Sequence, residues 1–116
     1  MGYDLSKFTL DEKIKLLAGK NTWELENANA KLPDVFLADG PHGLRMVDIS
    51  TMKTKKATAM PNNVVLANTW NEDLAYLSGN TIADDCIQNG AQVLLAPGVN
   101  IKRTPLCGRN FEYFSE

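Results

Sequence analysis

The sequence predicts an α/β protein in which short, buried, parallel strands alternate with helices. Three observations lead to this fold class. Short continuous apolar runs occur at residues 35–38, 64–67 and 93–96, as expected for strands buried on both faces. Segments with helical spacing of apolar residues lie before the first run and between the second and third. Gly- and Pro-rich loops follow the first and third runs.

Composition narrows the class of protein further. The chain has 116 residues, enough for one small domain, and its 44% hydrophobic and 22% charged residues are typical of a globular protein. A net charge of −2 gives no basic footprint for nucleic acid or an anionic membrane, and no apolar run approaches the roughly 20 residues of a membrane helix. The N-terminal residues lack the apolar core of a signal peptide, so a cytoplasmic location is expected. Cys86 and Cys107 are then expected to be reduced, and their spacing indicates no zinc site.

The first helix is predicted by its N-terminal signal. Thr9 and Glu12 have the spacing of a capping box, in which each side chain accepts a hydrogen bond from the other residue's backbone N–H. Apolar residues then recur at helical spacing as far as Leu17, and Gly19 is placed to end the helix.

The remaining elements follow in order. After the first strand, Gly40, Pro41 and Gly43 require a tight loop, and residues 46–61 form a long basic connection that is expected to be solvated. The run at 64–67 is interpreted as the second strand. Asn71 then caps a second helix that ends near Asn89 and Gly90 and uses Cys86 as a small core residue. The strand at 93–96 is expected to stop at Pro97 and Gly98.

Ligands of parallel α/β proteins bind at the loops that follow the strands. The loop after the first strand contains Asp39, His42 and Arg45, and the loop after the third contains Arg109 and Glu112, with Lys102 and Arg103 before them. A carboxylate accepts hydrogen bonds from two hydroxyl groups, and a guanidinium donates in a rigid fork. This combination suits a sugar.

Structural explanations remain open for the same residues. Asp39 is equally able to cap its loop, and His42 is more typical of a hydrogen-bonded loop residue than of a catalytic base. A single histidine without a nearby nucleophile forms no triad. Arg109 and Glu112 are also correctly spaced for an ion pair that only stabilises the loop.

Several motifs together resemble glycoside hydrolase family 3. DGPHGLR at residues 39–45 is similar to the family's DGPHGxR signature, and residues 96–116 are similar to its GPGxNIxRxPxxGRNFEYxSED stretch. LDEKIKLLAGK at 10–20 resembles the family's usual opening. ATAMP at 57–61 and NTWN at 68–71 match two shorter elements, with Met60 in place of an aromatic residue and Asn71 in place of Asp.

The resemblance implies a fold and a domain organisation. It implies that residues 1–116 are the N-terminal portion, about three strands, of a (β/α)8 TIM-type barrel, which typically takes about 250 residues. The remainder of the barrel and a second α/β domain are absent from the chain. The expected partner of the chain is therefore the rest of the barrel, on the same or a second chain.

The resemblance also implies an activity, that of a retaining, exo-acting β-glucosidase on a β-glucoside or oligosaccharide. Asp39, Arg45 and Arg109 are then expected to bind the sugar in subsite −1, with His42 and Glu112 in supporting roles. No metal or cofactor is implied. A retaining glycosidase needs two carboxylates about 5–5.5 Å apart, and the family's nucleophile and acid/base are expected outside this chain. The isolated chain is therefore expected to be inactive.

Three alternatives stay open from the sequence. In the first alternative, the chain is a sugar-binding module without hydrolytic activity. The second is a β-xylosidase or N-acetylglucosaminidase of the same family. In the third, Asp39 and Glu112 themselves form a catalytic carboxylate pair.

Overall fold

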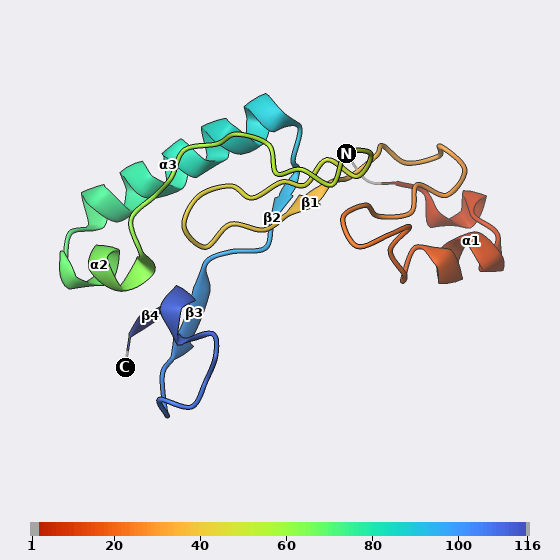
Figure 1. Cartoon of the computed structure of the whole chain (residues 1–116). Coiled ribbons are helices and arrows are strands. Elements are labelled where there is room, and N and C mark those ends of the chain that lie inside the picture. The colour runs from red at the N-terminus through yellow and green to blue at the C-terminus, as the bar shows by residue number, and fades with distance from the viewer. Residues whose placement is uncertain (1–2, 116) are drawn as a thin grey trace. The chain divides into compact units, whose positions relative to one another are not determined.

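The chain folds as two compact units, the first ending at Leu37 and the second beginning at Ala38 (Figure 1). The computed structural model describes residues 3–115. The first unit contains η1 (Leu5–Lys7) and α1 (Leu10–Lys15), and β1 (Leu37–Ala38) lies at the junction of the units. The second unit contains, in chain order, α2 (Asn63–Asn68), α3 (Glu72–Asn89), β2 (Val93–Leu94), β3 (Gly98–Ile101), η2 (Asn110–Glu112) and β4 (Tyr113–Ser115).

The predicted capping box is confirmed at the start of α1. The Thr9 hydroxyl accepts a hydrogen bond from the Glu12 backbone N–H at 3.2 Å, and the Glu12 carboxylate accepts one from the Thr9 N–H at 2.8 Å. The predicted end of this helix at Gly19 is wrong, because α1 already ends at Lys15. Leu17 is 90% exposed, so no packing contact supports another helical turn. Gly19 instead pairs with Leu25 in an antiparallel bridge.

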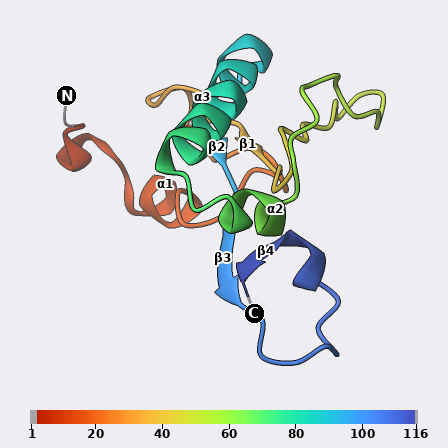
Figure 2. The same cartoon turned by 90° about the vertical axis from the view of Figure 1, so that its left-hand side faces the viewer.

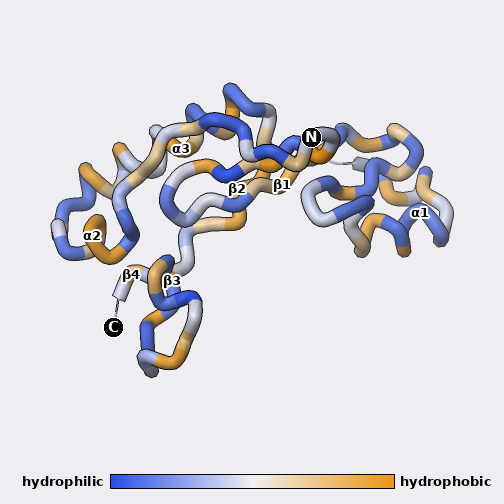
Figure 3. The backbone as a smooth tube through the Cα atoms, viewed as in Figure 1, coloured by the Kyte–Doolittle hydropathy of each residue, from blue (hydrophilic) through white to orange (hydrophobic). Residues whose placement is uncertain are grey.

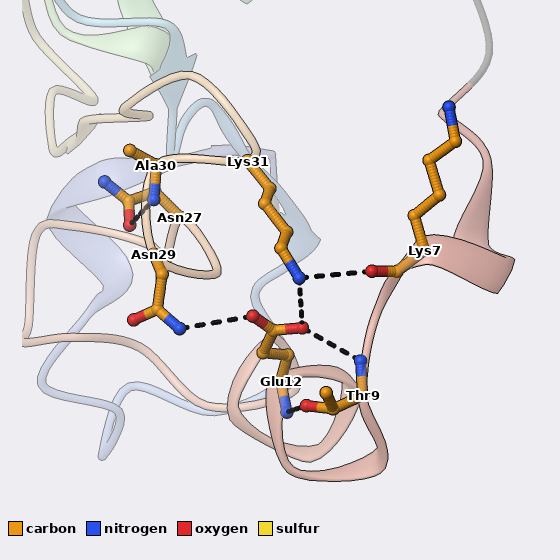
Figure 4. A network of polar contacts seen from close by, with 7 residues as sticks. All are labelled: Lys7, Thr9, Glu12, Asn27, Asn29, Ala30 and Lys31. Atoms are coloured by element: carbon orange, nitrogen blue, oxygen red, sulfur yellow. Dashed lines mark hydrogen bonds and ion pairs between the residues drawn. The ribbon is translucent and has the colours of Figure 1, made fainter.

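Glu12 is the centre of a polar network that stabilises the first unit (Figure 4). Besides the Thr9 N–H, its buried carboxylate accepts hydrogen bonds from Lys31 Nζ at 2.7 Å and Asn29 Nδ2 at 3.2 Å. The Lys31 bond, followed by the Thr9 N–H, lowers the pKa of Glu12 to about 2. Lys31 also donates to the Lys7 carbonyl oxygen at 3.1 Å. One carboxylate therefore connects α1 to the turn at residues 27–31.

The core of the second unit forms around the end of β1. Leu95 N–H donates to the Ala38 carbonyl oxygen at 2.8 Å, and β1 and β2 form a two-stranded sheet. The buried core residues are Ala38, Leu44 and Ala91, against which Met46, Cys86 and Leu94 pack partly buried. Strands therefore occur within the predicted runs 35–38 and 93–96, although each covers only two residues.

The predicted strand at residues 64–67 is wrong, because this run lies within the helix α2. These residues form a helix because Asn62 provides an N-terminal cap. Its side-chain Oδ1 accepts a hydrogen bond from the Val64 N–H at 2.9 Å. A four-residue apolar run fits either a buried strand or one helical turn. The middle of α2 is accordingly apolar (Figure 3).

The predicted second helix is confirmed as α3. Asn71 Oδ1 accepts a hydrogen bond from the Leu74 N–H at 3.1 Å, and Gly90 ends the helix in the left-handed conformation with a φ of 77°. Cys86, on the last turns of α3, packs against the core as expected, and burial raises the pKa of its thiol. Both Cys86 and Cys107 are free.

β3 lies in the segment that the sequence predicted to be a loop, and β4 follows that segment. β3 and β4 pair in parallel, with Gly98 opposite Tyr113 and Ile101 opposite Ser115. The predicted stop of the strand at 93–96 is confirmed, because β2 ends at Leu94 and residues 95–97 lie in no strand. β3, which begins at Gly98, belongs to the other sheet. α2 lies beside β4 in two perpendicular views (Figures 1 and 2) and packs against it. Within residues 3–115 the strands form two two-stranded sheets, β1 with β2 and β3 with β4, in an α/β arrangement.

Candidate functional site

The loop after β1 brings Asp39 and Arg45 together. The Arg45 N–H donates to the Asp39 carbonyl oxygen at 2.7 Å, so the loop returns to its starting point. Their side chains form an ion pair, with Arg45 Nη1 3.8 Å from Asp39 Oδ2. The Arg45 side chain is 62% exposed and that of Asp39 is 39% exposed, so both charged groups remain accessible to a ligand. An exposed pair of this kind contributes little to stability.

Gly43 lets this loop pack closely on a second segment. Its φ is 111°, and a Cβ atom at this position would lie 2.1 Å from the Thr58 carbonyl oxygen. The Met60 N–H donates to the His42 carbonyl oxygen at 2.9 Å. The Asp85 carboxylate on α3 accepts hydrogen bonds from the Thr58 N–H at 2.8 Å and the Thr58 hydroxyl at 3.4 Å. The helix α3 therefore supports the loop that carries Asp39 and Arg45.

His42 connects this loop to the segment that carries Arg109. Its ring lies edge-on to Phe111, with ring centroids 6.0 Å apart and an interplanar angle of 64°. His42 Nε2 is buried and has no hydrogen-bond partner among residues 3–115. The ring contact between His42 and Phe111 thus joins the loop after β1 to the turn η2, and the supporting role of His42 stays a prediction.

Arg109 and Glu112 form an ion pair through Arg109 Nε and Glu112 Oε1. The 3-10 turn η2 joins them, because the Glu112 N–H donates to the Arg109 carbonyl oxygen at 3.1 Å. The Glu112 side chain is only 10% exposed, whereas that of Arg109 is 70% exposed. Glu112 raises the pKa of Arg109 above its ordinary value, and Tyr113 and Asp39 act in the same direction.

Three residues that the sequence analysis did not select also contact the site loops. Asp85 holds Thr58, as described above, and Asn62 and Asn63 donate hydrogen bonds to the backbone of the segment after Arg109. The asparagines gave one usable signal, since Asn62 precedes an apolar run as an N-cap does. Their side-chain donors, however, reach residues 49 positions away, which no local pattern indicates.

No group of three or more His, Cys, Asp or Glu side chains that could hold a metal ion occurs among residues 3–115. In the same part of the chain, no helix has the length and apolar character needed to cross a membrane.

These features describe an α/β chain with charged side chains on the loops that follow its strands, where ligands of such folds bind. The chain belongs to glycosyl hydrolase family 3, because the model of the N-terminal domain of that family matches residues 7–116. The resemblance found in the motifs is thereby confirmed.

Individual relatives agree with the family. Beta-glucosidase B of Emericella nidulans is 50% identical over 113 residues, covering 97% of this chain and 13% of the relative. Exo-alpha-(1->6)-L-arabinopyranosidase of Bifidobacterium longum is 42% identical over 115 residues, covering 93% and 15%. The structure of beta-glucosidase 3B from Thermotoga neapolitana in complex with glucose superposes with a TM-score of 0.81 at 38% identity, covering 95% and 18%. The chain thus spans less than a fifth of the length of each of these relatives.

Proposed function

We propose that this chain supplies the sugar-binding loops of a retaining, exo-acting β-glucosidase, with Asp39, Arg45 and Arg109 at subsite −1. One observation carries the proposal: these three charged side chains lie on two loops of the second unit that His42 and Phe111 connect. A solved relative with a TM-score of 0.81 contains glucose, which supports a sugar as the ligand.

Each residue has a chemical task in this proposal. Asp39 accepts hydrogen bonds from hydroxyl groups of the terminal sugar, and Arg45 and Arg109 donate to its oxygens. Arg45 also neutralises Asp39 at 3.8 Å, without burying it. Glu112 orients Arg109, and His42 shapes the first loop. Binding that strengthens as the ring distorts towards the transition state accelerates the reaction.

The two catalytic carboxylates are proposed to come from the rest of the barrel, outside this chain. The contacts of Glu112 argue against the alternative in which it forms a catalytic pair with Asp39. Its carboxylate is almost fully buried and already engaged by Arg109, so it is poorly placed to attack a sugar or protonate a leaving group. Asp39 in turn is paired with Arg45.

The proposal is tested with a hybrid enzyme, in which this chain replaces the matching segment of Thermotoga neapolitana beta-glucosidase 3B. We expect the hybrid enzyme to hydrolyse an aryl β-glucoside and the isolated chain not to do so. Asp39→Asn in the hybrid enzyme should lower kcat/KM by about 100-fold or more, since the interaction strengthens in the transition state. Asp84→Asn, an exposed carboxylate on α3, is the control and should leave kcat/KM unchanged.

Two results would contradict this assignment. Equal kcat/KM values for Asp39→Asn and Asp84→Asn would remove Asp39 from the sugar site. Turnover by the isolated chain that Glu112→Gln abolishes would place a catalytic carboxylate within residues 3–115.

The arabinopyranosidase relative, at 42% identity, favours one second candidate. An α-L-arabinopyranoside differs from a β-D-glucoside in the orientation of the C4 hydroxyl and in lacking the hydroxymethyl group. We propose the glucoside as the preferred substrate because the relative with 50% identity is a β-glucosidase. Comparing kcat/KM for the two aryl glycosides in the hybrid enzyme decides between them, and a preference for the arabinopyranoside would favour the second candidate.

A further inference from the structure

The ion pair that orients Arg109 depends on a turn too short to be stable alone. η2 contains only three residues, Asn110–Glu112, and its N-cap residue, Arg109, makes no capping hydrogen bond through its side chain. A single 3-10 turn has poor hydrogen-bond geometry and fixes several dihedral angles for one hydrogen bond. The position of Glu112, and with it that of Arg109, therefore requires support from elsewhere in the fold.

Two consecutive asparagines at the start of α2 provide contacts of the required kind. Asn62 Nδ2 donates to the Phe111 carbonyl oxygen at 2.9 Å, and Asn63 Nδ2 donates to the Glu112 carbonyl oxygen at 2.8 Å. The second bond is buried, and Asn63 is only 5% exposed. Both acceptors lie on η2, and one belongs to the residue that holds Arg109.

Helix capping explains only part of this arrangement. Asn62 caps α2 through Oδ1, for which aspartate or serine would serve equally well. The Nδ2 donors take no part in the cap, and Asn63 is the first residue of the helix, directly after its N-cap. The amide donors of both residues are directed at the arginine-bearing segment.

We propose that Asn62 and Asn63 are positioning residues for sugar binding, which fix η2 through the carbonyl oxygens of Phe111 and Glu112 and thereby hold Arg109 towards the ligand. The proposal rests on the proposed function, in which Arg109 binds the sugar. Asn63 acts through Glu112, and Asn62 acts through Phe111, whose ring also contacts His42. The hydrogen bonds from Asn62 and Asn63 thus also support the contact between the two site loops.

Asn63→Asp tests the buried donor with little change in size. Aspartate cannot donate to the Glu112 carbonyl oxygen when ionised, and its charge suits the N-terminal end of α2. Asn68→Asp is the matched control on the same helix: the Asn68 amide also donates to a carbonyl oxygen, that of Val64 at 2.8 Å, but does not reach η2. Because a carboxylate at the C-terminal end of a helix is unfavourable, this control is at least as demanding for α2.

Two measurements on the full chain report the effect. NMR spectroscopy follows the Nε–H signal of Arg109, whose rate of exchange with water reports the hydrogen bond to Glu112. Titration with glucose gives the dissociation constant. Asn63→Asp should accelerate exchange of the Arg109 Nε–H and weaken glucose binding about three- to tenfold, whereas Arg109→Ala should weaken it by about tenfold or more.

A double-mutant cycle separates positioning from general destabilisation. If Asn63 acts through Arg109, the double variant that combines Asn63→Asp with Arg109→Ala should bind glucose no more weakly than Arg109→Ala alone. Additive losses, or equal effects of Asn63→Asp and Asn68→Asp, would overturn the proposal. If Asn63→Asp does not fold, Asn62→Asp retains the helix cap and removes only the donor to Phe111, so an unchanged Arg109 signal in that variant would overturn it too.

The same data distinguish failure of the proposed function. Glucose that leaves the Arg109 signals of the wild-type chain unchanged, or an Arg109→Ala variant that binds glucose normally, would overturn the sugar-binding role of Arg109 itself. Normal glucose dependence at Arg109 combined with no effect of Asn63→Asp would overturn only the positioning role.

Discussion

Gly43 is a residue of the Asp39 loop at which a single added methyl group should be harmful. Its φ of 111° is unfavourable for any residue with a Cβ atom, which costs about 1–2 kcal/mol. The added Cβ would also lie 2.1 Å from the Thr58 carbonyl oxygen, which belongs to the backbone and cannot rotate away. Forcing apart such packed segments costs roughly a further 1–3 kcal/mol.

Gly43→Ala should therefore lower the free energy of unfolding by about 2–5 kcal/mol, a large part of the roughly 5–15 kcal/mol of a typical domain. Gly90→Ala provides the control, because Gly90 also has a positive φ, 77°, but no atom within 4 Å of the added Cβ. Alanine reduces the entropy of the unfolded chain equally at both positions, so the difference between the variants reports the contact with Thr58 together with the less favourable φ of Gly43.

Urea unfolding followed by the circular dichroism of the helices measures both variants. We expect a clearly lower midpoint for Gly43→Ala than for Gly90→Ala at an unchanged slope. Equal midpoints would refute the argument that the Asp39 loop and residues 57–60 are packed without space for a methyl group.

Two predictions concern the network around Glu12. Thr9→Ala should lower the free energy of unfolding by about 1 kcal/mol because the Glu12 N–H loses its capping acceptor, whereas Thr9→Ser should retain it; equal urea midpoints for the two variants would contradict the capping role. Glu12 has a folded-state pKa of about 2, below its ordinary value of 4.5, so its contribution to stability is fully present above pH 4.5 and is lost as the pH falls through 2. NMR titration of the Glu12 carboxyl group measures this pKa directly, and in Lys31→Ala, which removes the largest cause of the shift, it should move back towards 4.5.

Sequence reasoning succeeded where the physical cause is local. The capping box at Thr9, the N-cap at Asn71 and the left-handed end of α3 at Gly90 each depend on residues within one helical turn. Their hydrogen bonds follow from residue type and spacing alone. These elements were therefore predicted at the correct positions.

Prediction from the sequence failed where a contact with residues outside the segment decides its structure. Residues 64–67 carry no periodicity that separates a strand from a helical turn, and the decisive cap lies on Asn62, outside the apolar run. β3 exists because β4 pairs with it, and their partner residues Gly98 and Tyr113 lie far apart in sequence. Pro97 itself lies between β2 and β3 and belongs to neither strand.

In the candidate site, too, the residues that belong to local motifs were predicted and those that act through long-range contacts were not. Asp39, Arg45 and Arg109 were recognised because they belong to compact motifs, and the structure places the first two in contact and pairs the third with Glu112. Asp85 was missed because its acceptor role for Thr58 spans 27 positions, and the two asparagines of α2 were missed for the same reason. Motifs thus indicate the side chains proposed to contact the ligand better than the side chains that hold them in place.

The contrast between the buried Glu112 carboxylate and the exposed Arg109 side chain explains why an arginine suits position 109. Its Nε–H is committed to a buried carboxylate, while the side chain as a whole stays 70% exposed, so one planar group can be anchored on one side and donate to a ligand on the other. A lysine carries a single ammonium at the end of a flexible stem, and pairing it with Glu112 would draw the charge into the protein. The support of Arg109 by Glu112, and of Glu112 by Asn63, is useful only to a side chain with two faces. The buried part of the site therefore accounts for the residue type of its exposed part.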